Sequence, residues 1–420
     1  MPLLKTILAS QLPSARRDPL DAAVLDVVRT IMEDVRARGW AAVVDHARRL
    51  GDLTGDAPAV YEPGQLKAAL DALAPDERGV LERTAARIAE FARAQKACLK
   101  PLTLVKPGRS AGHAICPVET AGCYAPGGRF PLPSSVLMTA VTARVAGVNQ
   151  LWVASPRPVP ATLAAAAIAG IDGLLAVGGP QAIAAFAFGA GPVPACDTIV
   201  GPGNKWVTAA KHLATQYTTI DMLAGPSEVL IIADADADPA LIAADLLAQA
   251  EHDTDALAIL VTTSDPLIAR VTRELEVQLA TLDTAAIARE ALTKNGYAVL
   301  VSSLEEAISI SDRIAPEHLE IMTADAGALA KRAKHYGAVF IGAKSAEVMG
   351  DYGAGPNHVL PTGGMARSIG GLSVFNFLRV RTWLEMSNSA EAMLIAKDAA
   401  ALARMEGLHA HARAADQRTT

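Results

Sequence analysis

The chain has 420 residues, of which 51% are hydrophobic and 20% charged, with a formal net charge of −6. This length suggests two to three domains, and the hydrophobic content excludes a disordered chain. The acidic balance excludes a general basic face for nucleic acid, and the sequence has no apolar run long enough to predict a membrane span. The four cysteines lack CxxC spacing. This pattern, without a secretory leader, favours free thiols in the cytoplasm.

The first hundred residues show helical periodicity. Leu25, Val28 and Ile31 recur at spacings of three residues, and Leu66 and Leu70 are four apart. Such spacing places apolar side chains on one face of a helix. We expect a mainly helical N-terminal segment without residues that carry chemistry.

From residue 122 the pattern changes to alternating strands and helices. Strands are predicted at residues 150–155, 173–177 and 198–200, with helices over 136–145 and 161–169 and from 181. Further strands at 227–233 and 257–262 flank a helix from 238, and a second βα set follows, with strands at 298–301 and 337–341 and a helix from 303. This alternation is typical of βαβ units around a parallel sheet.

Three glycine turns lie where strands are expected to end, at residues 125–128, 177–181 and 201–204. Glycine allows a phosphate to approach backbone N–H groups at the carboxyl end of a strand, next to a helix N-terminus. None of the turns has the G-x-G-x-x-G pattern, so each alone is typical of an ordinary turn. Together they favour a dinucleotide or another anionic ligand, with Tyr124, Gln181 and Asn204 as its polar or stacking contacts.

Gln249 and His252 lie three residues apart near the end of the helix predicted from residue 238. They therefore project from one face, where an amide oxygen and an imidazole can share a metal ion. A simple polar helix end with a histidine near its negative pole remains the alternative.

Glu317 and His318 follow Pro316 at a predicted helix start. An imidazole titrates near neutrality and suits proton transfer, and a neighbouring carboxylate can orient or deprotonate water. The alternative is a favourable N-terminal charge beside an exposed histidine.

Two further histidine regions stand near the C-terminus. Asp351 and His358 lie in a glycine- and proline-rich stretch, for which we expect a rigid, exposed loop offering oxygen and nitrogen ligands. His409 and His411 are two residues apart and cannot share a helix face, so at most one of them binds a common metal if the segment is helical. A pair of histidines in an unstructured tail is the alternative.

Taken together, these motifs resemble the histidinol dehydrogenase family. The resemblance runs from about residue 24 to residue 411 and rests on collinear segments: GCYAPGGRFPLPSSVLMTAVTARVAGV, GPGNKWVTAAK, IDMLAGPSEVLIIAD, LLAQAEHD, IAPEHLEI, GDYGAGPNHVLPTGG and GGLSVFNFLR. It implies an NAD-dependent, zinc-containing homodimer that oxidises L-histidinol through L-histidinaldehyde to L-histidine, the last steps of histidine biosynthesis.

The resemblance also implies a role for individual residues. It assigns one Zn²⁺ per subunit to Gln249, His252, Asp351 and His411, with His411 reaching the partner subunit's site. Glu317 and His318 match the acid–base pair, and Tyr124, Gln181 and Asn204 match the NAD contacts. The implied substrate contacts are Ser227, Gln249, His252, His318, Asp351, His358, Glu406 and His411.

The βα alternation and the resemblance together predict an α/β fold with two Rossmann-like, incomplete parallel-sheet lobes and helical ends. We expect a helical segment at 1–105, a lobe with the NAD loops at 106–235, a lobe with the metal and acid–base residues at 236–370, and a helical tail at 371–420.

The sequence departs from the family pattern at residues 99–117 and at Arg129 and Phe130. These departures keep open a related zinc- and NAD-dependent dehydrogenase that oxidises another primary amino or sulfonated alcohol to the carboxylate. A binding scaffold without catalysis would lack a ligand or an acid–base residue, and the sequence lacks neither.

Overall fold

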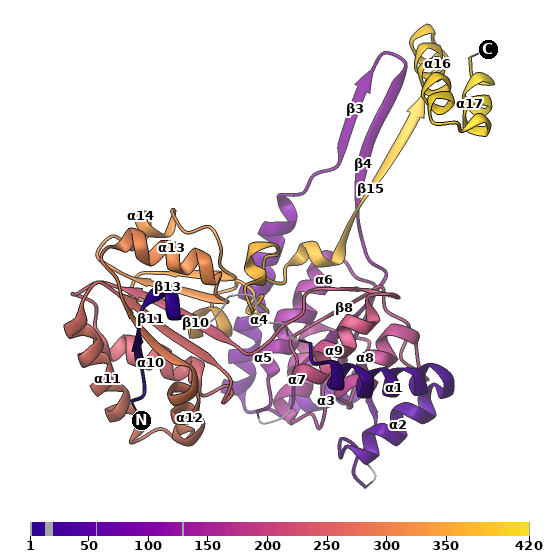
Figure 1. The fold of residues 1–420 in the computed structure, drawn as a ribbon. Helices are drawn as coiled ribbons and strands as arrows, with labels where there is room; N and C mark the ends of the chain where they lie inside the picture. The colour runs from indigo at the N-terminus through magenta and orange to yellow at the C-terminus, as the bar shows by residue number, and fades with distance from the viewer. Residues whose placement is uncertain (1, 13–19, 56, 128–129, 420) are drawn as a thin grey trace.

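The computed structural model describes residues 2–12, 20–55, 57–127 and 130–419. Two lobes of helices and parallel sheet lie side by side, and a long arm projects away from both (Figure 1). The predicted α/β class with parallel-sheet cores and helices at both ends is confirmed. Among the described residues, no helix combines the length and apolarity needed to cross a bilayer.

The predicted helical N-terminal region is present. It contains α1 (Ala22–Arg38), α2 (Trp40–Arg49), α3 (Pro63–Ala72) and α4 (Pro75–Ala97). Asp21 caps α1 by accepting the Ala23 N–H at 2.8 Å, which satisfies one of the free donors of the first turn. The buried face of α1 includes Val28 and Val35, and it packs against the helices of the first lobe.

The first lobe is built on a six-stranded sheet. Its strands lie in the order β2 (Val60–Tyr61), β7 (Gly173–Leu175), β6 (Gln150–Ala154), β5 (Thr120–Tyr124), β8 (Thr198–Val200) and β9 (Thr219–Ile220). All neighbours pair in parallel except β2 with β7. The order reverses direction between β5 and β8, which is where open α/β sheets bind ligands beyond their strand ends.

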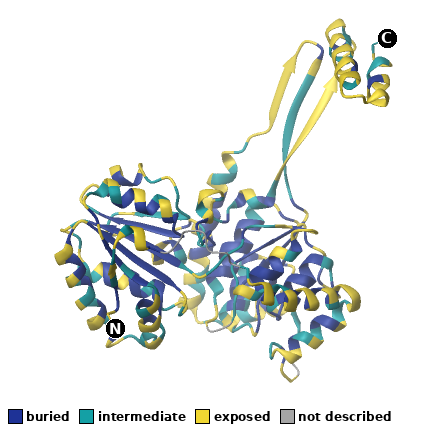
Figure 2. Ribbon diagram, in the orientation of Figure 1, coloured by how far each residue is buried: buried dark blue, intermediate teal, exposed yellow. Residues whose placement is uncertain are grey.

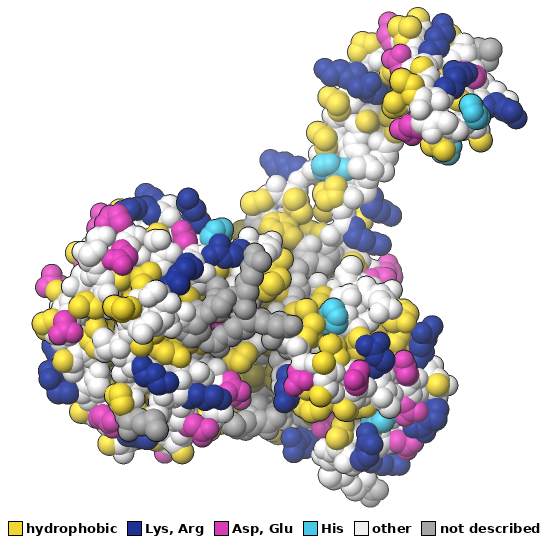
Figure 3. Space-filling model, viewed as in Figure 1, with side chains coloured by type: hydrophobic (Ala, Val, Ile, Leu, Met, Phe, Trp, Pro, Cys, Tyr) yellow, Lys and Arg dark blue, Asp and Glu magenta, His cyan; other side chains and the backbone are white. Residues whose placement is uncertain are grey.

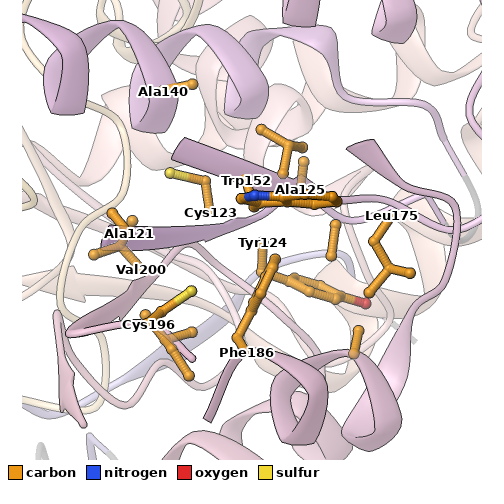
Figure 4. Packing of buried hydrophobic residues seen from close by; sticks show 14 of the residues in the cluster. Ala121, Cys123, Tyr124, Ala125, Ala140, Trp152, Leu175, Phe186, Cys196 and Val200 are labelled. Atoms are coloured by element: carbon orange, nitrogen blue, oxygen red, sulfur yellow. The ribbon is translucent and has the colours of Figure 1, made fainter. Parts of the chain in front are cut away.

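Helices cover both faces of this sheet, and the core of the lobe lies between the helices and the strands. They are α5 (Pro133–Val136) with a π-helical turn (Leu137–Val141) and α6 (Thr142–Ala146), then α7 (Pro160–Ala169), α8 (Gly179–Phe188) and α9 (Lys205–Ala214). Figure 4 shows Phe186 pointing from α8 toward Tyr124 and the strands. A Cβ atom at Gly122 of β5 would lie 2.6 Å from the Phe186 ring, so glycine permits this close packing.

The second lobe repeats the same strand order. Its sheet runs β1 (Lys5–Ile7), β12 (Gly296–Leu300), β11 (Leu257–Thr262), β10 (Glu228–Ala233), β13 (His318–Met322) and β14 (Ala338–Ile341), with all neighbours parallel. Its helices are α10 (Pro239–Ala250), α11 (Asp265–Leu279), α12 (Ala285–Asn295), α13 (Leu304–Ile314), α14 (Ala326–Ala330) and α15 (Glu347–Tyr352). The division into segments at 1–105, 106–235, 236–370 and 371–420 remains a prediction about domains.

Two strands of the second sheet lie outside the segment predicted for the second lobe, 236–370. They are β1 and β10, which pair with β12 and β11.

The arm is an antiparallel sheet that the sequence reasoning did not predict. It consists of β3 (Leu102–Lys106), β4 (Arg109–Pro117) and β15 (Leu378–Met386), and carries α16 (Ala390–Met405) and α17 (His409–Asp416) at its tip (Figure 1). β15 joins β4 with Leu378 opposite Pro117. Both β3 and β15 are exposed along nearly their whole length, in contrast to the buried sheets of the lobes (Figure 2).

Candidate functional site

Glu317 and His318 lie at the start of a strand, and the predicted helix start is wrong. Ala315, with φ of 52°, is the left-handed C-cap of α13, and His318 opens β13. A proline is common both in the first turn of a helix and just after a helix end, so Pro316 alone could not decide between them. The buried residues that follow His318 pair with β10 and β14, and this sheet pairing fixes the strand.

The imidazole of His318 is surrounded by carboxylates. Its Nδ1 lies 3.7 Å from Glu317 Oε2 and 3.5 Å from Glu347 Oε2, and its Nε2 lies 3.7 Å from Asp351 Oδ1. Nδ1 is also 3.1 Å from the backbone oxygen of Glu228. The Glu228 N–H in turn donates to Glu317 Oε2 at 2.9 Å, which holds this carboxylate beside the imidazole.

Burial and these charges shift the pKa values of the couple. Burial raises the pKa of Glu317 to about 8, against the opposing charge of His318. Burial acts to lower the pKa of His318, but the charges of Glu317, Glu347 and Asp351 outweigh it and raise the pKa to about 10. Both pKa values lie above the ordinary values of these groups. Glu317 and His318 therefore stay protonated to a higher pH than exposed residues of the same type.

Asp351 lies on α15, so the expected exposed loop is wrong at this position. Its side chain is only 14% exposed and lies near His318, because α15 packs beside α10 and its first residue, Glu347, donates its N–H to Glu320 of β13. His358 does lie in the following loop, and its Nδ1 is 3.0 Å from the Asp351 backbone oxygen. Its Nε2 is 3.3 Å from Ser135 Oγ of α5, so this contact joins the first lobe to the candidate site.

Gln249 and His252 stand at the end of α10, close enough for the His252 charge to act on Asp351 and His358. Gln249 is 1% exposed, and its Oε1 has no hydrogen-bond partner among the described residues. His252 follows the helix and is exposed. A buried amide oxygen without a hydrogen-bond donor destabilises the fold unless a metal ion or a bound molecule contacts it. Gln249 is therefore a candidate metal ligand.

The C-terminal candidates are not brought to these residues within one chain. Glu406 is the C-cap of α16 and His411 lies on α17, both exposed at the tip of the arm. Ser227 precedes β10, where its backbone oxygen accepts the Leu257 N–H at 2.9 Å. Within the described ranges, no group of three or more His, Cys, Asp or Glu side chains is arranged to hold a metal ion by itself.

The three predicted dinucleotide contacts follow strands of the first sheet. Tyr124 ends β5, and its hydroxyl oxygen accepts the Gly179 N–H at 3.1 Å. Gln181 is fully buried near the start of α8, and its Oε1 lacks a hydrogen-bond partner in the described part of the chain. Asn204 caps α9 by accepting the N–H groups of Trp206 and Val207. Residues 128–129 of the loop after β5 lie outside the described residues.

Sequence reasoning missed several buried acids behind the site. Glu347 faces His318, its N–H donates to Glu320 Oε1 at 2.7 Å, and Glu320 also contacts Asp245 of α10. Burial raises the pKa of Glu347 to about 8 and that of Glu320 to about 9. An acid within the apolar run of β13 was the available signal for Glu320, whereas Glu347 and Asp245 had none.

Two doubly wound sheets, with a buried acid–imidazole couple where their lobes meet, are the arrangement of an α/β enzyme. Comparison with known proteins gives the family: its model, described as histidinol dehydrogenase, matches residues 14–419. The chain belongs to the histidinol dehydrogenase family, a family of oxidoreductases.

Individual relatives resemble the chain over nearly its whole length. It is 45% identical over 399 residues to histidinol dehydrogenase of Thermus thermophilus, covering 95% of each protein. It is 42% identical over 404 residues to that of Dechloromonas aromatica, covering 95% of this chain and 93% of the relative. The crystal structure of histidinol dehydrogenase from Elizabethkingia anophelis superimposes with a TM-score of 0.91 at 31% identity, covering 100% of this chain and 98% of that one.

Proposed function

We propose that the protein oxidises L-histidinol through L-histidinaldehyde to L-histidine, using NAD and a zinc ion, in the last steps of histidine biosynthesis. Family membership supports the substrate. The observation that carries the proposal is the buried contact of His318 with both Glu317 and Asp351, because it joins an acid–base couple to a ligand candidate. The four free cysteines agree with a cytoplasmic setting.

The residues around Asp351 fit a zinc ion. Gln249 supplies a buried amide oxygen without a hydrogen-bond partner among the described residues, Asp351 a carboxylate, and His252 an imidazole. This borderline-hard set of oxygen and nitrogen donors suits Zn²⁺, and His411 of a second copy would complete it. When bound, the metal would orient the amine and imidazole of the substrate.

We infer that NAD binds at the first sheet, where it would accept the hydride of each oxidation step. The buried Gln181 Oε1, without a partner in the described ranges, offers an acceptor to the dinucleotide. Tyr124 and Asn204 lie at the same edge of the sheet, after β5 and β8. Because ligands bind beyond the carboxyl ends of such strands, we infer that these three side chains contact the cofactor.

The couple performs two different tasks. His318, in its neutral form, accepts the alcohol proton, and the carboxylates beside its two ring nitrogens hold the imidazole in position. Glu317, in its ionised form, deprotonates the water that adds to the aldehyde, and that water supplies the second carboxylate oxygen of the product. Ser227, His358 and Glu406 are proposed to contact the substrate.

The arm supports a homodimer. Leu102, Val105, Val380 and Leu384 are between 51% and 70% exposed, so apolar surface lies on an isolated antiparallel sheet. Figure 3 shows hydrophobic side chains along this arm. Exposed apolar surface of this kind marks protein interfaces, and a second copy would both cover it and receive His411.

A substrate panel tests the proposal. Purified protein with NAD is expected to form NADH with L-histidinol, to lose this activity on chelation, and to regain it with Zn²⁺. The panel also contains primary amino alcohols and sulfonated diols, which test whether the protein oxidises a related alcohol instead. Turnover of one of these in place of histidinol would contradict the proposed substrate, and full activity after complete metal removal would contradict the zinc role.

A further inference from the structure

The loop after β6 carries an exposed arginine in a rare backbone conformation. Arg157 has φ of 47°, and among the described residues only Ala315 is another non-glycine with positive φ. Ala315 closes a helix, but Arg157 lies between β6 and α7 with its side chain in solvent. Such strain clusters at ligand sites, where the surrounding structure holds it in place.

Neighbouring loops fix this backbone. A Cβ atom at Gly127, after β5, would lie 2.4 Å from the Pro156 backbone oxygen, and one at Gly178, after β7, would lie 2.8 Å from Pro156 Cγ. The three loops therefore interlock at the carboxyl edge of the first sheet. Arg157 projects from the middle one.

The carboxylate of Asp52, in the turn after α2, contacts the start of α8. Asp52 Oδ2 accepts the Gly178 N–H at 2.9 Å and lies 3.3 Å from Gln181 Nε2. Burial raises the pKa of Asp52, and the Gly178 hydrogen bond and the Arg157 charge act against that rise, so the guanidinium is within electrostatic reach. The fully buried Gln181 Oε1, unpartnered among the described residues, lies at the same helix start.

We propose that Arg157 binds a phosphate group of the nicotinamide dinucleotide, and that Asp52 is a positioning residue that holds the turn from Gly178 to Gln181. This inference rests on the proposed function for the presence of a dinucleotide. β6 is the second strand of the doubly wound order, and the loop after that strand faces the adenosine ribose in folds of this type. A planar guanidinium there suits either the pyrophosphate or a ribose 2′-phosphate.

The test is the binding of NADH and NADPH to Arg157→Gly, measured by fluorescence titration. Glycine adopts positive φ without strain, so this variant removes the guanidinium, keeps the loop, and is expected to melt no lower than the unchanged protein. We expect this variant to bind NADH and NADPH, or NADPH alone, about tenfold more weakly than the unchanged protein does. An equal loss of affinity for both dinucleotides would show that Arg157 contacts the pyrophosphate. A loss of affinity for NADPH alone would show that it contacts the 2′-phosphate.

Two further variants sharpen the result. Arg29→Ala, which removes an exposed arginine of α1, is expected to bind as the unchanged protein does. Asp52→Asn is expected to weaken both dinucleotides less than Arg157→Gly. Binding of both by Arg157→Gly within twofold of the unchanged protein would overturn this inference alone. Failure of the unchanged protein to bind either dinucleotide would overturn it together with the proposed NAD role.

Discussion

At the scale of single residues, the chemistry of His318 follows from its neighbours. Three carboxylates lie within 4 Å of one buried imidazole, so the proton affinity of the cluster exceeds that of an exposed histidine. Glu317 and Glu347 both face Nδ1, whereas Asp351 faces Nε2. The two ring nitrogens therefore have different surroundings, which suits a group that must both accept and release a proton.

The division of labour within the couple predicts the behaviour of Glu317→Gln. The amide can still accept the Glu228 N–H, so the variant should fold, but it cannot deprotonate water. We expect the oxidation of histidinaldehyde to slow by about 10²-fold or more, with a smaller loss on the alcohol step. Rates of NADH formation from supplied histidinol and supplied histidinaldehyde measure the two steps separately. An equal loss in both would reject this assignment.

The buried Glu320 predicts a pH-dependent stability. Burial raises its pKa from 4.5 to about 9, so between these values the folded state holds a proton that the unfolded chain has lost. Its contribution to the free energy of unfolding therefore falls as the pH rises through this window. In metal-free protein, Glu320→Gln should give a flatter melting temperature between pH 5 and 9 and a higher one at pH 9. The exposed Glu33→Gln is the control, and a Glu320→Gln profile parallel to it would refute the prediction.

At the scale of elements, the cofactor and acid–base candidates occupy opposite strand ends of two similar sheets. Tyr124 ends β5 and Asn204 follows β8, whereas His318 and Glu228 open β13 and β10. Contacts such as His358 with Ser135 bring the two edges together. The site therefore depends on how the lobes meet as well as on either sheet.

This arrangement explains how far the sequence could predict the structure. Local patterns predicted many strands and helices of the lobes and the glycine turns, because apolar periodicity and turn residues act over short distances. They missed β5, because its glycine and the breakers that follow it are typical of a loop. The strand at His318 and the pairing of β1 with β12 depend on contacts between distant segments, which periodicity does not contain. The arm was missed because its strands lack a buried face that would give an alternating pattern.

Packing of the first sheet against α8 predicts a cost for Gly122→Ala. The added Cβ would lie 2.6 Å from the fully buried Phe186 ring, so the ring or the strand must move. We expect a loss of about 1–3 kcal/mol in the free energy of unfolding, seen as a lower melting temperature. Gly327→Ala on α14 is the matched control, because no atom lies within 4 Å of its Cβ position. Equal melting of the two variants would contradict this packing.

At the scale of the whole molecule, the arm separates Glu406 and His411 from the other site candidates of the same chain. In the proposed dimer, the tip of a second copy would complete the site, and the exposed apolar strands of the arm would be covered by that copy.

Shared sites predict complementation between two inactive variants. His318→Ala and His411→Ala homodimers should each be inactive or nearly so. In a mixed dimer, one site keeps both histidines, so an equal mixture that is dissociated and reassociated should recover about a quarter of the activity. Mixing without dissociation is the control. A mixture that stays inactive despite formation of mixed dimers would show that His411 does not serve the partner's site.

The stoichiometry of the complete reaction shows whether one protein carries out both oxidations. A limiting amount of L-histidinol is incubated with excess NAD, and NADH and L-histidine are both quantified at the end point. Two oxidations on one protein predict two NADH and one L-histidine for each L-histidinol consumed, without accumulation of the aldehyde. One NADH per histidinol, with the aldehyde as the final product, would contradict the account.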